Sequence, residues 1–161
     1  MKNKVLLPSW IYQNKIVTTI EEIANIANLS VNSLYGFVYG IHFQGNKFYI
    51  GKKNFFNTKE LHCLKNGTKR ENHVRFIGRI VDHKRTTLEV VQNESDWLSY
   101  YGSLKDTRGL IVLRRKILDI AISKRQLTYL EVFWQFRLNV LQDSRFLNEN
   151  ILGKFFRNNI T

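Results

Sequence analysis

The first residues that could perform chemistry are two tyrosines followed by a pair of lysines. Tyr39 and Tyr49 lie ten positions apart in an aromatic stretch, and Lys52 and Lys53 follow shortly after the second tyrosine. Hydrolysis of a phosphodiester needs an activated water, a sink for charge on the phosphate oxygens and stabilisation of the departing alkoxide. A tyrosine has an ordinary pKa of about 10, so it can activate a water only where nearby cations favour its phenolate. The two lysines are the candidate cations.

Glu131 is the carboxylate that we expect to hold a metal ion. It follows Leu127 by four positions and precedes Trp134 by three, so it borders the apolar stripe of a predicted helix and has no cation at the neighbouring helical positions. One Mg²⁺, or another divalent cation such as Mn²⁺, would balance its charge and leave positions for water and phosphate. A structural alternative stays open, because Thr128 and Glu131 have the spacing of a capping box.

The tyrosines can act together only if a β-hairpin places them on one face. Residues 36–43 and 47–51 are rich in the aromatic and branched residues that favour strands. A three-residue loop between them pairs Ile41 with Tyr49 and puts Tyr39 on the same face as Tyr49, whereas a two-residue loop puts the tyrosines on opposite faces. The Gly-Asn dipeptide in the turn slightly favours the shorter loop. We predict the longer loop, because the chemistry requires it.

Other segments frame this hairpin. Apolar periodicity and capping residues predict further elements, which are helices over 18–29 and 124–141 and strands over 87–91 and 110–118. Residues 52–85 lose periodicity and carry ten Lys or Arg, which predicts a long basic loop or insertion. Arg75 and Arg79 in this segment are our candidates for binding a substrate phosphate.

The composition predicts one globular domain over residues 1–161 that binds a polyanion. The chain has 25 Lys and Arg against 13 Asp and Glu, a formal net charge of +12 that favours nucleic acid as the partner. No apolar run approaches the roughly 20 residues that cross a membrane, and the first residues lack the apolar segment of a signal peptide. The lone Cys63 cannot form an internal disulfide, so we expect a cytoplasmic protein.

The motifs along the chain resemble the GIY-YIG nuclease family, particularly its phage-encoded members. Phe37-Val38-Tyr39 stands where the family has its first triplet, and Tyr49-Ile50-Gly51 matches the second. The order of later residues is also similar, namely Asp96-Trp97, Tyr101-Gly102-Ser103, a helical Glu131 and Asn148. Two positions depart from the family. Phe37 and Val38 replace Gly-Ile, and Lys59 stands where the family usually has a helical arginine.

The resemblance implies a fold and an activity. The fold would be of the α+β type within the broad α/β class, a small three-stranded antiparallel sheet flanked by helices, with an N-terminal extension over 1–34 and a basic insertion over 52–95. The activity would be that of a metal-dependent DNA endonuclease of the phage or homing kind, acting in the host cytoplasm if phage-encoded. Site selection would come from the basic segment, the N-terminal residues or a homodimer.

The resemblance also implies roles for individual residues. Tyr39 would be the base and Tyr49 would position the water or the scissile phosphate, with one of the two lysines supporting the phenolate or the phosphate. Glu131 would bind the metal ion. The substrate contacts would be Gly51, Ser103 and Asn148, together with Arg75 and Arg79.

Two other functions stay open at this point. The chain could be a non-catalytic nucleic-acid-binding protein with a degenerate nuclease site, for which the missing arginine is the best support. It could also be a basic structural protein of a nucleoprotein particle. That function would not require Tyr39 and Glu131 to lie near each other.

Overall fold

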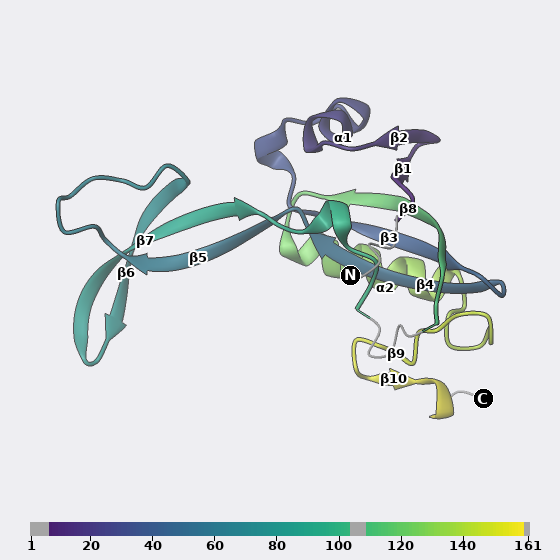
Figure 1. Cartoon of the computed structure of the whole chain (residues 1–161). Coiled ribbons are helices and arrows are strands. Elements are labelled where there is room, and N and C mark those ends of the chain that lie inside the picture. The colour runs from purple at the N-terminus through teal and green to yellow at the C-terminus, as the bar shows by residue number, and fades with distance from the viewer. Residues whose placement is uncertain (1–6, 104–108, 160–161) are drawn as a thin grey trace. The chain divides into compact units, whose positions relative to one another are not determined.

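The computed structural model describes residues 7–103 and 109–159. The chain divides into two compact units, and the second is inserted into the first. The first unit comprises Met1–Phe55 with Asp96–Thr161, and the second comprises Phe56–Ser95 (Figure 1). Our expectation of a single domain stays a prediction. No helix in the described ranges has the length and apolar character that a membrane crossing requires.

The first unit is built on a five-stranded mixed sheet in the order β2-β1-β8-β3-β4. Its strands are β1 Trp10–Tyr12, β2 Lys15–Val17, β3 Gly36–Phe43, β4 Lys47–Asn54 and β8 Val112–Ala121. Only the pairing of β1 with β8 is parallel. The predicted three-stranded antiparallel sheet flanked by helices is therefore wrong. The short N-terminal strands add to the sheet, and a three-residue strand is too short to show periodicity in sequence.

The hairpin of β3 and β4 has the predicted three-residue loop. Ile41 pairs with Tyr49 and Phe43 with Lys47. The turn works because Gly45 and Asn46 both adopt positive φ, at 77° and 55°, which other residue types rarely do. The loop length therefore places the two tyrosines on one face of the sheet.

Two α-helices accompany this sheet, and both begin at the predicted caps. α1, Ile20–Ala27, starts at Thr19 with a capping box. α2, Lys124–Arg137, starts at Ser123, whose hydroxyl accepts from the backbone N–H of Gln126. The apolar side of α2 packs on the core at Val38 and Ile50. The remaining elements of this unit are the strands β9 Asn150–Ile151 and β10 Phe155–Phe156 and the 3-10 helices Val31–Ser33, Trp97–Ser99 and Arg157–Asn159.

The second unit is a three-stranded antiparallel sheet in the order β5-β7-β6. The strands are β5 Phe56–His62, β6 His73–Val81 and β7 Lys84–Glu94. We predicted a long basic loop or insertion here, and the loop is wrong because the segment forms three strands. Only the middle of β7 is buried, at Leu88 to Val91, whereas β5 and β6 are mostly exposed. Strands such as β5 and β6, whose two faces are both exposed to solvent, do not need alternating apolar residues. Their sequence therefore lacks the usual strand pattern.

Candidate active site

The tyrosine pair lies on one face of the sheet. The ring centroids of Tyr39 on β3 and Tyr49 on β4 are 6.2 Å apart. Gly51 pairs with Tyr39 across the two strands. A Cβ at Gly51 would lie 2.5 Å from the Tyr39 hydroxyl and 2.9 Å from Cε1 of Tyr49. Gly51 is therefore needed because the tyrosine rings occupy the space over its backbone.

Tyr39 is a fully buried phenol. Its exposed fraction is 0%, and its hydroxyl makes no hydrogen bond to any described residue. Burial raises the pKa of Tyr39 well above its ordinary value, and the nearby Tyr100 and Tyr49 raise it further. We expected the lysines to favour the phenolate, and the shift of this pKa runs the other way. In this structure Tyr39 is a neutral hydroxyl at neutral pH.

Tyr49 is half-buried and has a polar partner. Its hydroxyl lies 2.9 Å from Oγ of Ser103, in the segment that follows the 3-10 helix Trp97–Ser99. Burial raises the pKa of Tyr49, and the bond to Ser103 partly offsets this shift. The structure thus brings Ser103 to Tyr49, and the predicted contact of Ser103 with substrate stays a prediction. Tyr49 presents the more accessible hydroxyl of the pair.

Lys52 and Glu131 form an ion pair between β4 and α2. Nζ of Lys52 lies 2.8 Å from Oε2 of Glu131 and donates to the Thr128 hydroxyl at 3.2 Å. The Glu131 side chain is 15% exposed and that of Lys52 is 35% exposed. Glu131 also lies near enough to Tyr39 and Tyr49 to raise the pKa of both phenols. The capping-box alternative is wrong, because α2 begins at Ser123 and Thr128 lies inside it.

Lys53 occupies a different environment from Lys52. Its ammonium lies 2.5 Å from Oδ1 of Asp96 and 4.0 Å from the centre of the Tyr100 ring. The bond from Lys53 lowers the pKa of Asp96. The Tyr100 ring in turn meets Tyr39 edge to face, with centroids 5.7 Å apart. Tyr100 is a site residue that sequence reasoning missed, although it directly precedes the quoted Tyr-Gly-Ser triplet.

Arg115 fixes the segment that carries Tyr100. This arginine is 3% exposed, and its guanidinium donates to the backbone carbonyls of Pro8, Leu98 and Tyr100 at 2.7 to 2.8 Å. Burial lowers its pKa to about 10. Arg115 stands between Arg114 and Lys116 on β8, so the sequence offers no sign that this basic residue alone is buried. Its bonds are structural, because they end on the protein's own backbone.

The family-model comparison agrees with this geometry. The family described as "Putative endonuclease segE, GIY-YIG domain" matches residues 10–151. The chain belongs to the GIY-YIG family. Comparisons with curated proteins and with solved structures gave no match. Membership in a GIY-YIG endonuclease family indicates a nuclease with DNA as its substrate.

The GIY-YIG asparagine has a structural task in this chain. Asn148 is 4% exposed, its Oδ1 accepts from the N–H of Ile50 at 3.0 Å, and its Nδ2 donates to the Ile50 carbonyl at 2.8 Å. The side chain thus satisfies the open backbone edge of β4 as a neighbouring strand would. Its amide is committed to Ile50, and a direct substrate contact by Asn148 stays a prediction.

The GIY-YIG arginine has no counterpart at the predicted position. Lys59 lies exposed on β5, in the second unit, whereas the family usually has a helical arginine at this point. Arg75 and Arg79 lie on β6 of the same unit, and Arg79 forms an ion pair with Glu60 at 2.8 Å. Their contact with substrate stays a prediction. The phosphate-binding cation of this GIY-YIG domain is therefore not fixed by the family pattern.

Glu131 is the residue that would hold a magnesium ion, and magnesium binding at this position stays a prediction. Mg²⁺ usually binds one or two carboxylates and substrate phosphates rather than a cage of protein ligands. Within residues 7–103 and 109–159, no three His, Cys, Asp or Glu side chains cluster into such a cage. Glu131 supplies one carboxylate, and a cation, the ammonium of Lys52, lies against it in this structure.

Proposed function

We propose that this GIY-YIG protein is a metal-dependent endonuclease that hydrolyses DNA phosphodiester bonds with Mg²⁺ or Mn²⁺ at Glu131. The observation that supports this most directly is that Lys52, three positions after Tyr49 on β4, pairs with Glu131 on α2, which lies far along the sequence. The Lys52–Glu131 pair is 2.8 Å apart, and Glu131 acts electrostatically on Tyr49. A basic structural protein would not need this arrangement.

The protein groups divide the work of hydrolysis. Tyr49 offers an accessible hydroxyl that can orient the attacking water, and Ser103 holds that hydroxyl in place. Tyr39 is a neutral donor whose unused hydrogen bond can be satisfied when substrate enters. Lys52 can turn from Glu131 to a phosphate oxygen and balance the charge that develops there. A bound metal ion would stabilise the leaving oxygen as a Lewis acid.

DNA binding and biological setting belong to the same proposal. The net charge of +12 favours capture of DNA, and Arg75 and Arg79 on β6 are proposed phosphate contacts. The resemblance to phage-encoded members supports a phage or homing enzyme that acts in the cytoplasm, of a host cell if phage-encoded. A homodimer would let two sites cut opposite strands.

The test is cleavage of supercoiled plasmid with Mg²⁺ or with EDTA. We expect wild type to nick the plasmid only with Mg²⁺, and Glu131→Gln and Tyr49→Phe each to lower the rate by about 100-fold or more. Tyr39→Phe should also lower it. Glu21→Gln is the matched control, because Glu21 is an exposed carboxylate on the first turn of α1. Equal rates for Glu131→Gln and Glu21→Gln would contradict the proposed metal site.

One observation favours a non-catalytic nucleic-acid-binding protein as a second candidate. The strand β5 carries Lys59 where the family usually has a helical arginine. The same assay separates the two functions. Salt-sensitive DNA binding without cleavage of any plasmid, in either metal, would favour the binding protein.

A further inference from the structure

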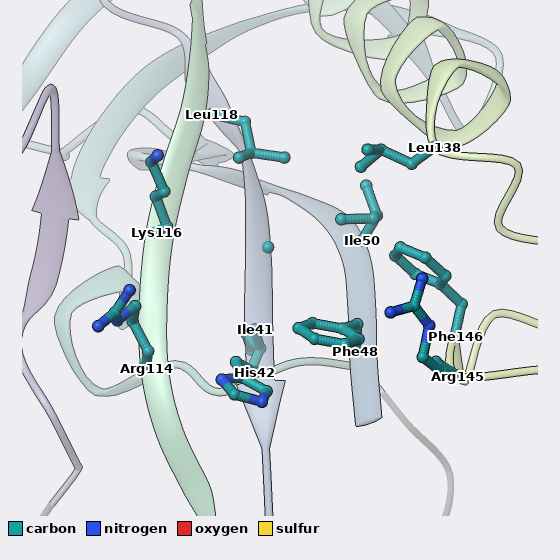
Figure 2. Close-up of a pocket in the computed structure, with 11 residues that line it drawn as sticks. Ile41, His42, Phe48, Ile50, Arg114, Lys116, Leu118, Leu138, Arg145 and Phe146 are labelled. Atoms are coloured by element: carbon teal, nitrogen blue, oxygen red, sulfur yellow. The ribbon is translucent and has the colours of Figure 1, made fainter. Parts of the chain in front are cut away.

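A groove lies on the face of the sheet opposite the tyrosines. The side chains of His42, Phe48 and Ile50 alternate along β3 and β4 with Tyr39 and Tyr49, so they point to the other side. A cavity of about 340 Å³ opens over them, and Leu138, just after the end of α2, borders it (Figure 2). We call this cavity the basic groove. Its volume is in the range of sites for small organic molecules and nucleotides.

The floor of the basic groove is aromatic. The rings of His42 and Phe48 are stacked, with centroids 4.6 Å apart and an interplanar angle of 11°. Phe146 lies beside Phe48 at 5.7 Å. None of the three rings is fully buried. A partly open aromatic floor is a surface on which a nucleobase can stack.

The rim of the basic groove is cationic. Arg114 and Lys116 are exposed on β8, and neither forms an ion pair with any described residue. Arg145 lies on the other side, with its guanidinium 5.9 Å from the centre of the Phe48 ring and paired with Asp143. Among the described residues that line the groove, none is acidic. Arg114 and Lys116 therefore favour an anionic occupant.

We propose that the basic groove binds an unpaired stretch of the DNA substrate, with a base on the His42–Phe48 floor and phosphates at Arg114 and Lys116. This inference rests on the proposed function. Phosphate contacts alone would serve duplex DNA equally well, whereas an accessible aromatic floor is useful only for a base outside the duplex stack. Lys52 lies four positions after Phe48 on β4, roughly 13 Å along the strand. The groove thus binds DNA that flanks the cleaved bond.

The test is fluorescence anisotropy of a labelled oligothymidylate and of a matched duplex, in EDTA so that neither is cut. The double variant Arg114→Ala with Lys116→Ala should bind the single strand about 10-fold more weakly. Its slope of log affinity against log salt should fall by about 1.4, since each lost contact to a single strand contributes about 0.7. His42→Ala should weaken binding at least about 5-fold by removing a stacking partner, without changing that slope.

The control removes the same charge from the same unit. Lys15→Ala with Arg125→Ala deletes two exposed cations on β2 and α2, outside the groove, and should change single-strand affinity by less than about 2-fold. Equal losses in the two double variants would overturn the groove. A duplex that responds to His42→Ala as strongly as the single strand would overturn the unpaired base. Circular dichroism melting of each variant excludes unfolding as the cause.

Failure of this proposal differs from failure of the nuclease. If wild type does not cut plasmid but binds the oligothymidylate through Arg114 and Lys116, the basic groove stands and the catalytic proposal falls. If wild type cuts with Mg²⁺ and the groove variants bind like the control pair, the catalytic proposal stands and the basic groove is overturned.

Discussion

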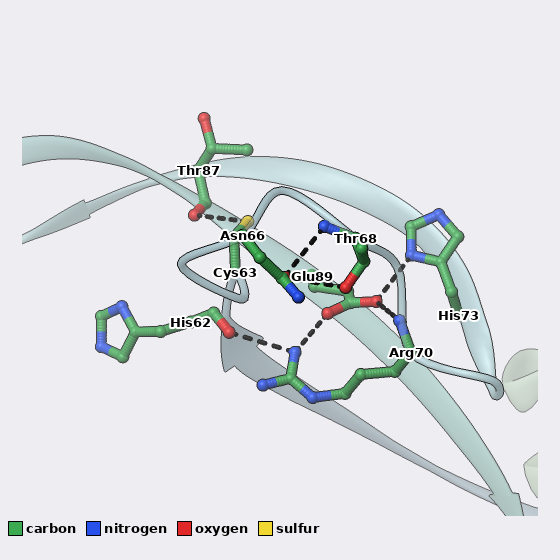
Figure 3. Close-up of polar contacts among 8 residues, drawn as sticks. All are labelled: His62, Cys63, Asn66, Thr68, Arg70, His73, Thr87 and Glu89. Carbon is green, nitrogen blue, oxygen red and sulfur yellow. Dashed lines mark hydrogen bonds and ion pairs between the residues drawn. The ribbon is translucent and has the colours of Figure 1, made fainter.

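Two completely buried polar groups, the Tyr39 hydroxyl in the first unit and the Glu89 carboxylate in the second, have opposite environments. In the first unit, the Tyr39 hydroxyl is inaccessible and makes no hydrogen bond to a described residue. In the second unit, the Glu89 carboxylate is equally inaccessible. It accepts from the backbone N–H of Arg70 at 2.7 Å, from the Arg70 guanidinium, and from Nδ1 of His73 at 3.1 Å (Figure 3).

This difference is the one expected between a structural carboxylate and the hydroxyl of a proposed site residue. A fully bonded carboxylate holds the 63–72 segment onto β7, and these bonds lower the pKa of Glu89. A buried hydroxyl without a partner costs free energy and calls for an explanation, which a substrate or water in the tyrosine site would provide. The buried carboxylate of the second unit therefore stabilises the fold of that unit. The buried hydroxyl of the first unit can still form a hydrogen bond.

The largest effect is expected for Glu89→Ala. This substitution removes the acceptor of the Arg70 backbone N–H and leaves the Arg70 guanidinium with the His62 carbonyl alone, so amides of β5, β6 and β7 should exchange hydrogen about 100-fold faster. Amides of β3 and β4 should keep their protection. Glu60→Ala is the control within the same unit, because its pair with Arg79 is exposed. Hydrogen exchange read by mass spectrometry would contradict this account if both variants behaved alike.

A smaller effect is expected for Gly51→Ala in the first unit. The added methyl would collide with both tyrosine rings, so we expect a loss of about 1 to 3 kcal/mol in the free energy of unfolding and at least 10-fold slower cleavage. Gly78→Ala on β6 is the matched control, since no atom lies within 4 Å of its added Cβ. Denaturant unfolding and plasmid cleavage measure the two effects. A Gly51→Ala protein that cuts at the wild-type rate would show that the tyrosine packing is not required.

The smallest effect concerns alkaline pH and the raised pKa of Tyr39. The unfolded chain releases the Tyr39 proton near pH 10, whereas burial keeps that proton on the folded protein to higher pH. The stability from this difference is complete below pH 10 and is lost as pH rises through the folded pKa, at up to about 1.4 kcal/mol per pH unit. Tyr39→Phe should lose less stability between pH 10 and 11. Equal losses in wild type and Tyr39→Phe would contradict the buried, neutral phenol.

The sequence predicted the hairpin and the helices well because their signals are local. Positive-φ residues in the turn, apolar periodicity and side-chain caps act within a few positions of one another. We predicted the three-residue hairpin loop because the proposed chemistry requires it, although local turn preference favours two residues. The structure confirms this loop, because Ile41 pairs with Tyr49. The motif residues likewise led to the family that the family model confirms.

The second unit and the sheet order could not be predicted in this way. Strands β5 and β6 expose most of their residues, and β1 and β2 are three residues long, so none carries a usable pattern. Glu89 is an acidic residue in a basic segment, and nothing in its neighbours indicates that Arg70 and His73 will enclose it.

By itself, the sequence determined which side chains share a face, because strand alternation and helical periodicity follow from the backbone. Only the tertiary structure decided the partners of those side chains: Lys52 with Glu131, Lys53 with Asp96, and Asn148 with the backbone of Ile50. These contacts join residues more than 40 positions apart, and their geometry depends on how β4 packs against α2 and its neighbours. The pKa of Tyr39 was decided in the same way, since its burial arises from the packing of the whole unit.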